Sequence, residues 1–153
     1  MPDQRNIATN RRARYDYFIE DRIEAGLVLR GAEVKSLRQH KVSLVEGYAR
    51  IEKGEVWLHD VHIAPYEKSN RWGVDPLRSR KLLLHKREIL RLRHRTEQKG
   101  YTLIPLRMYF RDGYAKVELG LCRGKRQYDR RRAIAERDER RDLERQLSER
   151  SRE

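Results

Sequence analysis

The sequence has a single cysteine, and that scarcity excludes several classes of protein. Cys122 has no partner within the chain, so neither an internal disulfide framework nor a Cys-x-x-Cys metal site can form. At the end of a strand pattern, a lone cysteine is more typical of a small apolar core residue than of a nucleophile. Long apolar runs are also missing: a run such as residues 82–84 is far too short to cross a bilayer, and the first residues lack the apolar segment of a signal peptide. We therefore expect a cytoplasmic protein with no membrane contact.

Motifs that carry catalysis or bind cofactors are absent as well. The chain has no Gly-rich phosphate loop, no His-Glu-x-x-His zinc motif and no Gly-x-Ser-x-Gly nucleophile turn. His59 and His62 have a spacing that can suggest a metal, but on a strand they would point to opposite faces. Asp60, Asp75 and Asp112 stand singly, unlike the clustered carboxylates of a nuclease. The sequence thus predicts no enzyme, no metal and no cofactor.

What the chain has in excess is positive charge. Its 153 residues include 37 Lys and Arg against 24 Asp and Glu, a formal net charge of +13. Such an excess favours polyanions, because each neutralised phosphate releases condensed counterions. Charged residues make up 40% and apolar residues 37%, which leaves room for one domain with a modest core. We interpret the chain as a nucleic-acid-binding protein and not merely a soluble basic one.

Residues 15–123 have the patterns of a small, mostly β domain. The clearest strands are 104–110 and 115–121, whose apolar residues alternate on either side of an Asp-Gly turn. Further extended segments are expected over 15–29, 48–51 and 55–63, the last two as a hairpin around a Lys-Gly turn. About six such strands with two short helices predict a small antiparallel β-barrel of the oligonucleotide-binding (OB) type.

Two short helices and two irregular positions complete the predicted domain. Residues 31–38 change to a helical period, and residues 86–98 form a second helix with one apolar and one cationic face and Gly100 as its stop. Gly26, within a strand pattern, suggests a bulge or a tight bend. Pro105 cannot donate to a strand ladder, so we expect its strand to be an edge there or to carry a bulge.

Basic segments flank the predicted barrel on both sides. Residues 1–14 form an N-terminal arm, and its basic stretch at 10–14 is either a frayed start or a grip for phosphate. Residues 124–153 begin with a cationic junction and end in a nearly neutral stretch, with six arginines and seven acids after residue 132. The composition of that stretch favours helix but offers few apolar residues to bury. We expect a tail that is disordered when free and helical when bound; the alternative is a frayed helix without a function.

Short motifs at seven places along the chain, in a fixed order, carry a further signal. They are Asn-Arg-Arg-Ala-Arg (10–14), Tyr-Phe-Ile (17–19), Glu-Ala-Gly-Leu (24–27), Glu-Val-Lys-Ser-Leu-Arg (33–38), Asp-Pro-Leu-Arg-Ser-Arg-Lys-Leu-Leu-Leu (75–84), Lys-Gly-Tyr-Thr-Leu (99–103) and Gly-Lys-Arg-Gln-Tyr-Asp-Arg-Arg (124–131). Together they resemble the SmpB family, the bacterial SsrA-binding proteins, from about residue 10 through the junction.

The resemblance implies a non-enzymatic OB-fold protein that binds transfer-messenger RNA (tmRNA) and delivers it to stalled ribosomes for trans-translation. In that family the barrel docks on the tRNA-like domain of tmRNA. The tail enters the empty mRNA channel near the decoding centre, against 16S rRNA. The implied partners are therefore tmRNA and the ribosome, with one monomer per tmRNA. From the residues alone, the alternative is a generic RNA-binding or ribosome-associated OB-fold protein.

Carried over position by position, the resemblance implies two sets of RNA-contacting residues. Lys116 can reach a phosphate, and Glu24 can accept from a base amine or a 2′-hydroxyl, or orient a neighbouring cation. Leu83 either supports that surface or belongs to the core. Tyr15 stands where relatives often have His and keeps the ability to stack. The family's Asp-Lys-Arg tail signature reads Asp-Arg-Arg here, which keeps the charge. The tmRNA-binding set is Glu24, Leu83, Lys116, Lys125 and Arg126, and the ribosome and decoding-centre set is Tyr15, Gly124, Asp129, Arg130 and Arg131.

Overall fold

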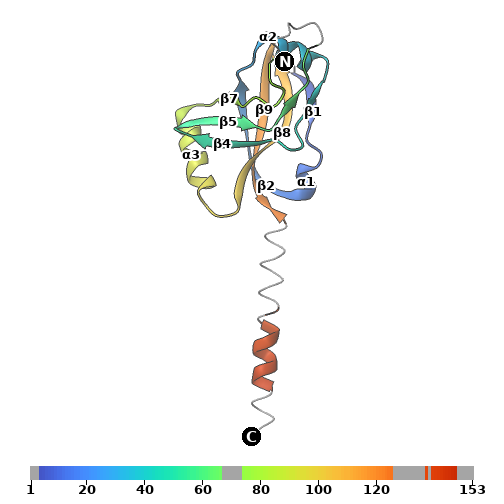
Figure 1. The fold of residues 1–153 in the computed structure, drawn as a ribbon. Coiled ribbons are helices and arrows are strands. Elements are labelled where there is room, and N and C mark those ends of the chain that lie inside the picture. The colour runs from blue at the N-terminus through green and yellow to red at the C-terminus, as the bar shows by residue number, and fades with distance from the viewer. Residues whose placement is uncertain (1–3, 67–73, 126–136, 138, 148–153) are drawn as a thin grey trace.

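The computed structural model describes residues 4–66, 74–125, 137 and 139–147. Figure 1 shows a strand-rich body with α2 at one end and α1 at the other. Its elements are β1 (Gln4–Thr9), α1 (Ala13–Asp16), β2 (Tyr17–Leu27), α2 (Gly31–Arg38), β3 (Val42–Ser43), β4 (Tyr48–Glu52), β5 (Glu55–His59), β6 (His62–Ile63), β7 (Arg80–Leu83), α3 (Lys86–Thr96), β8 (Tyr101–Arg111) and β9 (Tyr114–Gly124).

Six strands close on themselves as a ring. Hydrogen-bonded neighbours follow the order β8, β4, β5, β7, β2 and β9, and β9 pairs back onto β8. The pairings within the ring are antiparallel. β1 lies against β8 outside the ring, and β3 pairs with β6 in a separate two-stranded sheet. The predicted class, mainly antiparallel β with about six principal strands and few helices, is confirmed.

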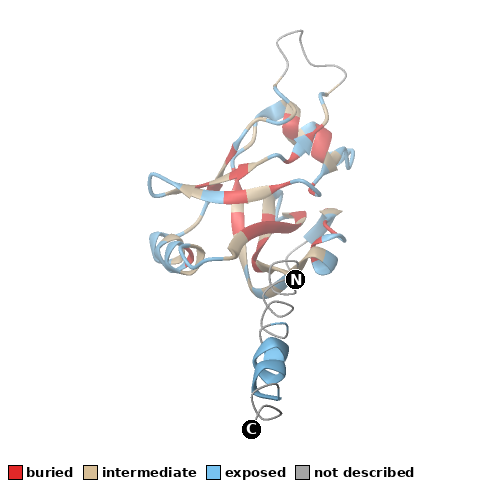
Figure 2. Ribbon diagram, turned by 60° about the horizontal axis from the view of Figure 1, so that its bottom comes forward, coloured by how far each residue is buried: buried red, intermediate tan, exposed pale blue. Residues whose placement is uncertain are grey.

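The core lies inside the ring because successive residues of a strand point to opposite faces. On β9, Val117, Leu119 and Leu121 are buried, whereas Lys116 and Glu118 remain partly exposed. Figure 2 shows the buried positions gathered in the middle of the strands. The outward positions of β9 are therefore available for contacts with a partner.

A second, smaller core cluster closes the α1 end of the body. Cys122 is fully buried there against Ala13, Ile104 and Leu106. Burial raises the pKa of the Cys122 thiol to about 12, so the thiol stays protonated at neutral pH. The prediction that Cys122 is a small apolar core residue is confirmed.

Local signals located the two predicted helices and the turns well, but α1 was missed: residues 15 and 16 were expected to be extended and lie in this short helix. α2 spans the predicted residues, and α3 ends at Thr96, before Gly100, which has a φ of +91°. Asp112 and Gly113 both have positive φ, as a two-residue hairpin turn of type I′ requires. Lys53 and Gly54 repeat that pattern between β4 and β5.

The predictions for the two irregular positions, Pro105 and Gly26, had different outcomes. The register of β8 shifts between Pro105 and Arg107, which confirms a bulge at the proline. Gly26 was expected to mark a bulge or a tight bend. It carries no bulge, because it pairs in regular register and the shift in β2 lies between Ile19 and Asp21. Gly26 is needed for a different reason, described below.

Part of the predicted N-terminal arm forms a strand of the sheet. Gln4–Thr9 pairs with β8 as strand β1, and Ile7 is buried against the core. The sequence pattern did not predict this strand, because Ile7 and Ala8 are its only apolar residues. Backbone pairing with β8, which local patterning does not encode, holds the segment in the sheet.

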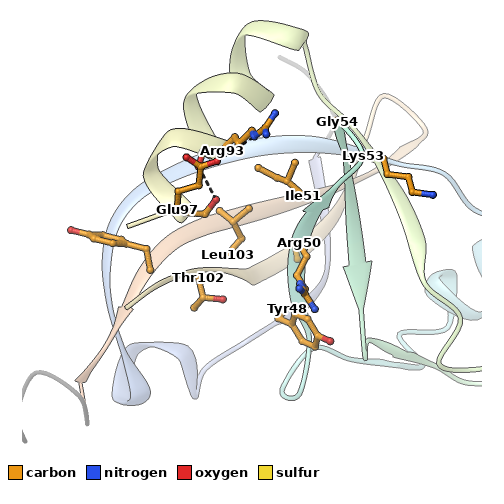
Figure 3. Close-up of a pocket in the computed structure, with 12 residues that line it drawn as sticks. Tyr48, Arg50, Ile51, Lys53, Gly54, Arg93, Glu97, Thr102 and Leu103 are labelled. Carbon is orange, nitrogen blue, oxygen red and sulfur yellow. Dashed lines mark hydrogen bonds and ion pairs between the residues drawn. The ribbon is translucent and has the colours of Figure 1, made fainter. Parts of the chain in front are cut away.

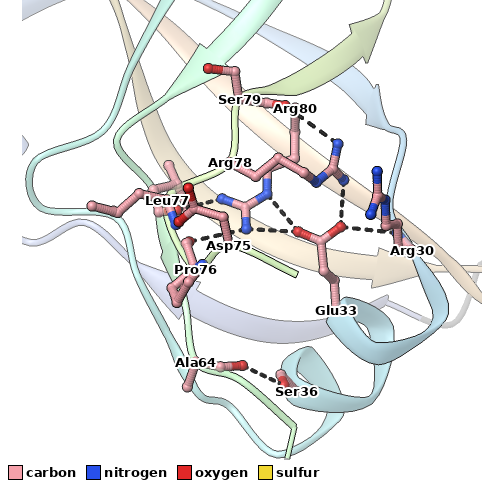
Figure 4. Close-up of polar contacts among 11 residues, drawn as sticks. Arg30, Glu33, Ser36, Ala64, Asp75, Pro76, Leu77, Arg78, Ser79 and Arg80 are labelled. Atoms are coloured by element: carbon pink, nitrogen blue, oxygen red, sulfur yellow. Dashed lines mark hydrogen bonds and ion pairs between the residues drawn. The ribbon is translucent and has the colours of Figure 1, made fainter. Parts of the chain in front are cut away.

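A buried ion cluster fixes the segment that leads into β7 (Figure 4). Glu33 on α2 is 3% exposed and accepts from Arg78 and from Arg80, whose Nε lies 2.7 Å from its carboxylate. Arg80 is 1% exposed and also donates to the backbone carbonyls of Val61 and Pro76. Because these contacts join α2 to the residues before β7, they hold β7 in its place in the ring.

The described part of the C-terminal tail is helical. Residues 139–147 form the helix that the composition favours, and all their side chains are exposed, including Leu143 and Leu147. That the helix forms only on binding stays a prediction.

Candidate nucleic-acid interface

Three residues of the predicted tmRNA-binding set meet on the outer face of the ring. Gly26 of β2 pairs with Leu83 of β7 on one side and with Lys116 of β9 on the other. Glu24 lies two residues before Gly26 and therefore on the same face. Leu83 is 54% exposed, so of its two alternatives the surface position is correct.

Gly26 provides the space in which these side chains lie. A Cβ built at this position would stand 3.2 Å from the Cβ of Leu83 and 3.7 Å from the Nζ of Lys116. The ammonium group of Lys116 thus lies beside the backbone of Gly26. Only a residue without a side chain leaves this arrangement undisturbed.

We expect Gly26→Ala to destabilise the fold by about 1 kcal/mol, because the added methyl presses on Leu83, and to weaken RNA binding by shifting Leu83 on this face. Gly31→Ala is the matched control, since no atom lies within 4 Å of a Cβ at that position. Urea unfolding and RNA titration of both variants measure the effects. RNA affinities that match between the two variants would contradict this role for Gly26.

Glu24 is held by a cation on the same face. Its carboxylate lies 2.7 Å from Nη1 of Arg111, and both side chains are partly exposed. Arg107 and Tyr109 share the outward face of β8 with Arg111. Sequence reasoning missed these three residues, although the alternation of β8 placed them opposite the apolar positions. It did foresee that Glu24 could orient a neighbouring cation.

Two residues of the predicted ribosome set meet at the other end of β2 and β9. Gly124, at the end of β9, pairs with Tyr17, and Tyr15 on α1 is 80% exposed. Lys125 donates to the carbonyl of Arg14 at 2.7 Å, which fixes the root of the tail against α1. This root lies roughly 20 Å from Glu24, at about 3.3 Å per strand residue.

The remaining predicted site residues separate into two cases. Lys125, predicted in the tmRNA set, lies at the tail root with Tyr15 and not beside Glu24. Its Nζ also stands 5.2 Å from the ring centroid of Phe18. Arg126, Asp129, Arg130 and Arg131 lie outside the described residues.

A separate open groove lies between α3 and the strands β4 and β8 (Figure 3). β4 and β8 pair only at Ala49 and Leu103, and the space left where they diverge has a volume of about 700 Å³. Arg50, Lys53 and Arg93 contribute positive charge to its lining. Sequence reasoning missed it because it exists only once α3 packs beside the ring.

The possible metal site is not formed. His59 is engaged with Ser79 and Glu52, and His62 belongs to a different strand, β6. Over the described ranges, no group of three or more His, Cys, Asp or Glu side chains could hold a metal ion. No helix in the same ranges is long and apolar enough to cross a membrane.

Comparison with known proteins shows extensive similarity. The family model for SmpB protein matches residues 7–149. The SsrA-binding protein of Listeria monocytogenes serovar 1/2a is 52% identical over 148 residues, which cover 97% of this chain and 96% of the relative. The SsrA-binding protein of Desulfitobacterium hafniense strain Y51 is 55% identical over 139 residues, 91% of this chain and 89% of the relative.

A solved structure agrees with these relatives. It is described as "tmRNA-SmpB: a journey to the center of the bacterial ribosome", and it matches with a TM-score of 0.66 at 57% identity. The match covers 77% of this chain and 83% of the other. The resemblance found in the short motifs therefore extends over nearly the whole sequence and to the fold, and the chain belongs to the SmpB family of SsrA-binding proteins.

Proposed function

We propose that this protein binds tmRNA and delivers it to stalled ribosomes for trans-translation, without catalysing a reaction itself. The observation that carries the proposal is the meeting of Glu24, Leu83 and Lys116 around Gly26 in a member of the SmpB family. Relatives named SsrA-binding proteins, and a relative described in a tmRNA complex at the ribosome, support the same partners.

In this proposal the two ends of β2 and β9 serve two partners. The face around Gly26, on a ring that we assign to the OB-type barrels, docks on the tRNA-like domain of tmRNA. The tail root, with Tyr15, Gly124 and Lys125, faces the decoding centre, and residues 127–153 continue into the empty mRNA channel. We assign Arg126 to tmRNA contacts and Asp129, Arg130 and Arg131 to ribosomal RNA. A cytoplasmic monomer, one for each tmRNA, fits this use.

The direct test is binding to the tRNA-like domain of tmRNA at physiological salt, in competition with excess ordinary tRNA. A complex that survives the competition supports specific recognition. If ordinary tRNA competes equally, net charge accounts for binding, and a generic RNA-binding protein becomes the better description.

We expect Lys116→Ala to lower affinity for the tRNA-like domain by about tenfold and to reduce the dependence of log K on log salt by about one unit, because one phosphate contact is lost. Lys99→Ala removes the same charge from the exposed turn between α3 and β8 and should leave affinity unchanged. Equal losses in both variants would indicate attraction by overall charge alone.

A further inference from the structure

Tyr109 is buried although its side chain lies on the outward face of the sheet and not inside the ring. It belongs to the outward face of β8, directly opposite Lys116 of β9, yet it is 3% exposed. The neighbouring inward position, Met108, belongs to the main core cluster inside the ring, whereas Tyr109 lies outside that cluster. Tyr109 is covered in part by a cation, since the guanidinium carbon of Arg107 lies 4.5 Å from its ring centroid. The tyrosine ring is thus embedded in the polar surface that carries Glu24 and Lys116.

Tyr109 lies beside Glu24, since Arg111, two residues further along the same face of β8, contacts the Glu24 carboxylate at 2.7 Å. Burial, followed by the negative charge of Glu24 and a hydrogen bond with it, raises the pKa of Tyr109 to about 12. The phenol is therefore protonated at neutral pH and has an O–H that can donate a hydrogen bond to the carboxylate. Since Tyr109 is opposite Lys116, and Lys116 is opposite Gly26, the phenol must extend across β9 to reach β2.

Glu24 is consequently held by two donors of different character. Arg111 contacts Oε2 of Glu24 from a side chain that is 44% exposed, so water and salt weaken that contact. Tyr109 is buried and has few rotamers open to it, so it defines the direction of the carboxylate more strictly. A carboxylate on a basic surface repels phosphate, and such a group contributes selectivity only where it meets a hydrogen-bond donor of the RNA.

We propose that Tyr109 is a positioning residue, which fixes Glu24 so that its carboxylate accepts from a base amine or a ribose 2′-hydroxyl of the bound RNA. The proposal rests on the proposed function, because it assigns Glu24 to the face that docks on the tRNA-like domain. It adds a residue that contributes to selectivity, Tyr109, which lies in none of the seven sequence motifs. Its consequence is that Tyr109 discriminates between RNAs without touching them.

The test is a double-mutant cycle with Tyr109→Phe and Glu24→Ala, measured as affinity for the tRNA-like domain and for ordinary tRNA. Tyr109→Phe keeps the ring under Arg107 and removes only the hydroxyl. We expect a loss of about fivefold to tenfold for the tRNA-like domain, the size of a typical net hydrogen-bond contribution, and little change for ordinary tRNA. In the Glu24→Ala background the same substitution should cause no further loss.

Tyr114→Phe is the matched control, since Tyr114 lies on the same face of β9 at 72% exposure. Urea midpoints of all variants separate loss of folding from loss of binding. A wild-type affinity in Tyr109→Phe, or an equal loss in both Glu24 backgrounds, would overturn the positioning role. If ordinary tRNA competes equally for the wild-type protein, the proposed function itself is contradicted. That result is obtained with the wild-type protein alone, so it is distinguished from a failure of the positioning role.

Discussion

Deleting residues 127–153, which keeps Arg126, is expected to leave affinity for the tRNA-like domain within about twofold of the full chain, while peptide tagging on stalled ribosomes falls by about 100-fold or more, because one of two linked contacts is lost. The fold tolerates this cut. β9 ends at Gly124, and Lys125 is the last described residue of the body, fixed by the carbonyl of Arg14. The face around Gly26 keeps every described contact that shapes it. Gel-shift binding and a tagging assay on ribosomes with truncated messages measure the two effects.

A finer version of this prediction separates charge from position in the tail. The double substitution Arg130→Ala with Arg131→Ala should damage tagging more than tmRNA affinity. Arg140→Ala with Arg141→Ala removes the same charge from the exposed helix at 139–147 and is the matched control. A truncated protein that still supports tagging would contradict the assignment of the tail to the ribosome.

The largest effect on stability is expected from Glu33→Ala, which should lower the free energy of unfolding by about 3–5 kcal/mol. The substitution leaves Arg80 as an uncompensated charge at 1% exposure, with Arg78 beside it. Glu55→Ala is the control, because its ion pair with Lys81 is about half exposed on both sides and should contribute less than about 1 kcal/mol. Urea denaturation measures both values, and similar losses in the two variants would show that the buried cluster is not critical.

The same carboxylate predicts a pH dependence. Burial alone would raise the pKa of Glu33, but hydrogen bonds from Arg78, the backbone of Arg30 and Arg80 outweigh it and lower the pKa below the ordinary 4.5. A lowered pKa in the folded state means that the contribution is fully present above the unfolded value and is lost as pH falls through the folded value. The stability difference between wild type and Glu33→Ala should therefore shrink below about pH 4.5. A difference that stays constant down to pH 3 would contradict this.

Some of the site could be predicted from the sequence and some could not. The family resemblance identified Glu24, Leu83 and Lys116, but whether Leu83 was surface or core depended on which face of β7 it occupied. The ion pair between Glu24 and Arg111 spans 87 residues and has no local signal. The position of Tyr109 beside Glu24 likewise depends on the pairing of β8 with β9 and of β9 with β2. Residues that act on the site through Glu24 were therefore missed.

By itself, the sequence determined the elements with short-range causes. The alternation along β8 and β9, the left-handed turn at Asp112 and Gly113, the stop at Gly100 and the excess of positive charge are each set by neighbouring residues or by composition. Only the tertiary structure decided that β9 closes the ring onto β8, that Gln4–Thr9 joins the sheet, and that Gly26 makes room for Lys116. Those contacts join residues far apart in the chain, and their free energy exists only after the strands have paired, so no local pattern carries them.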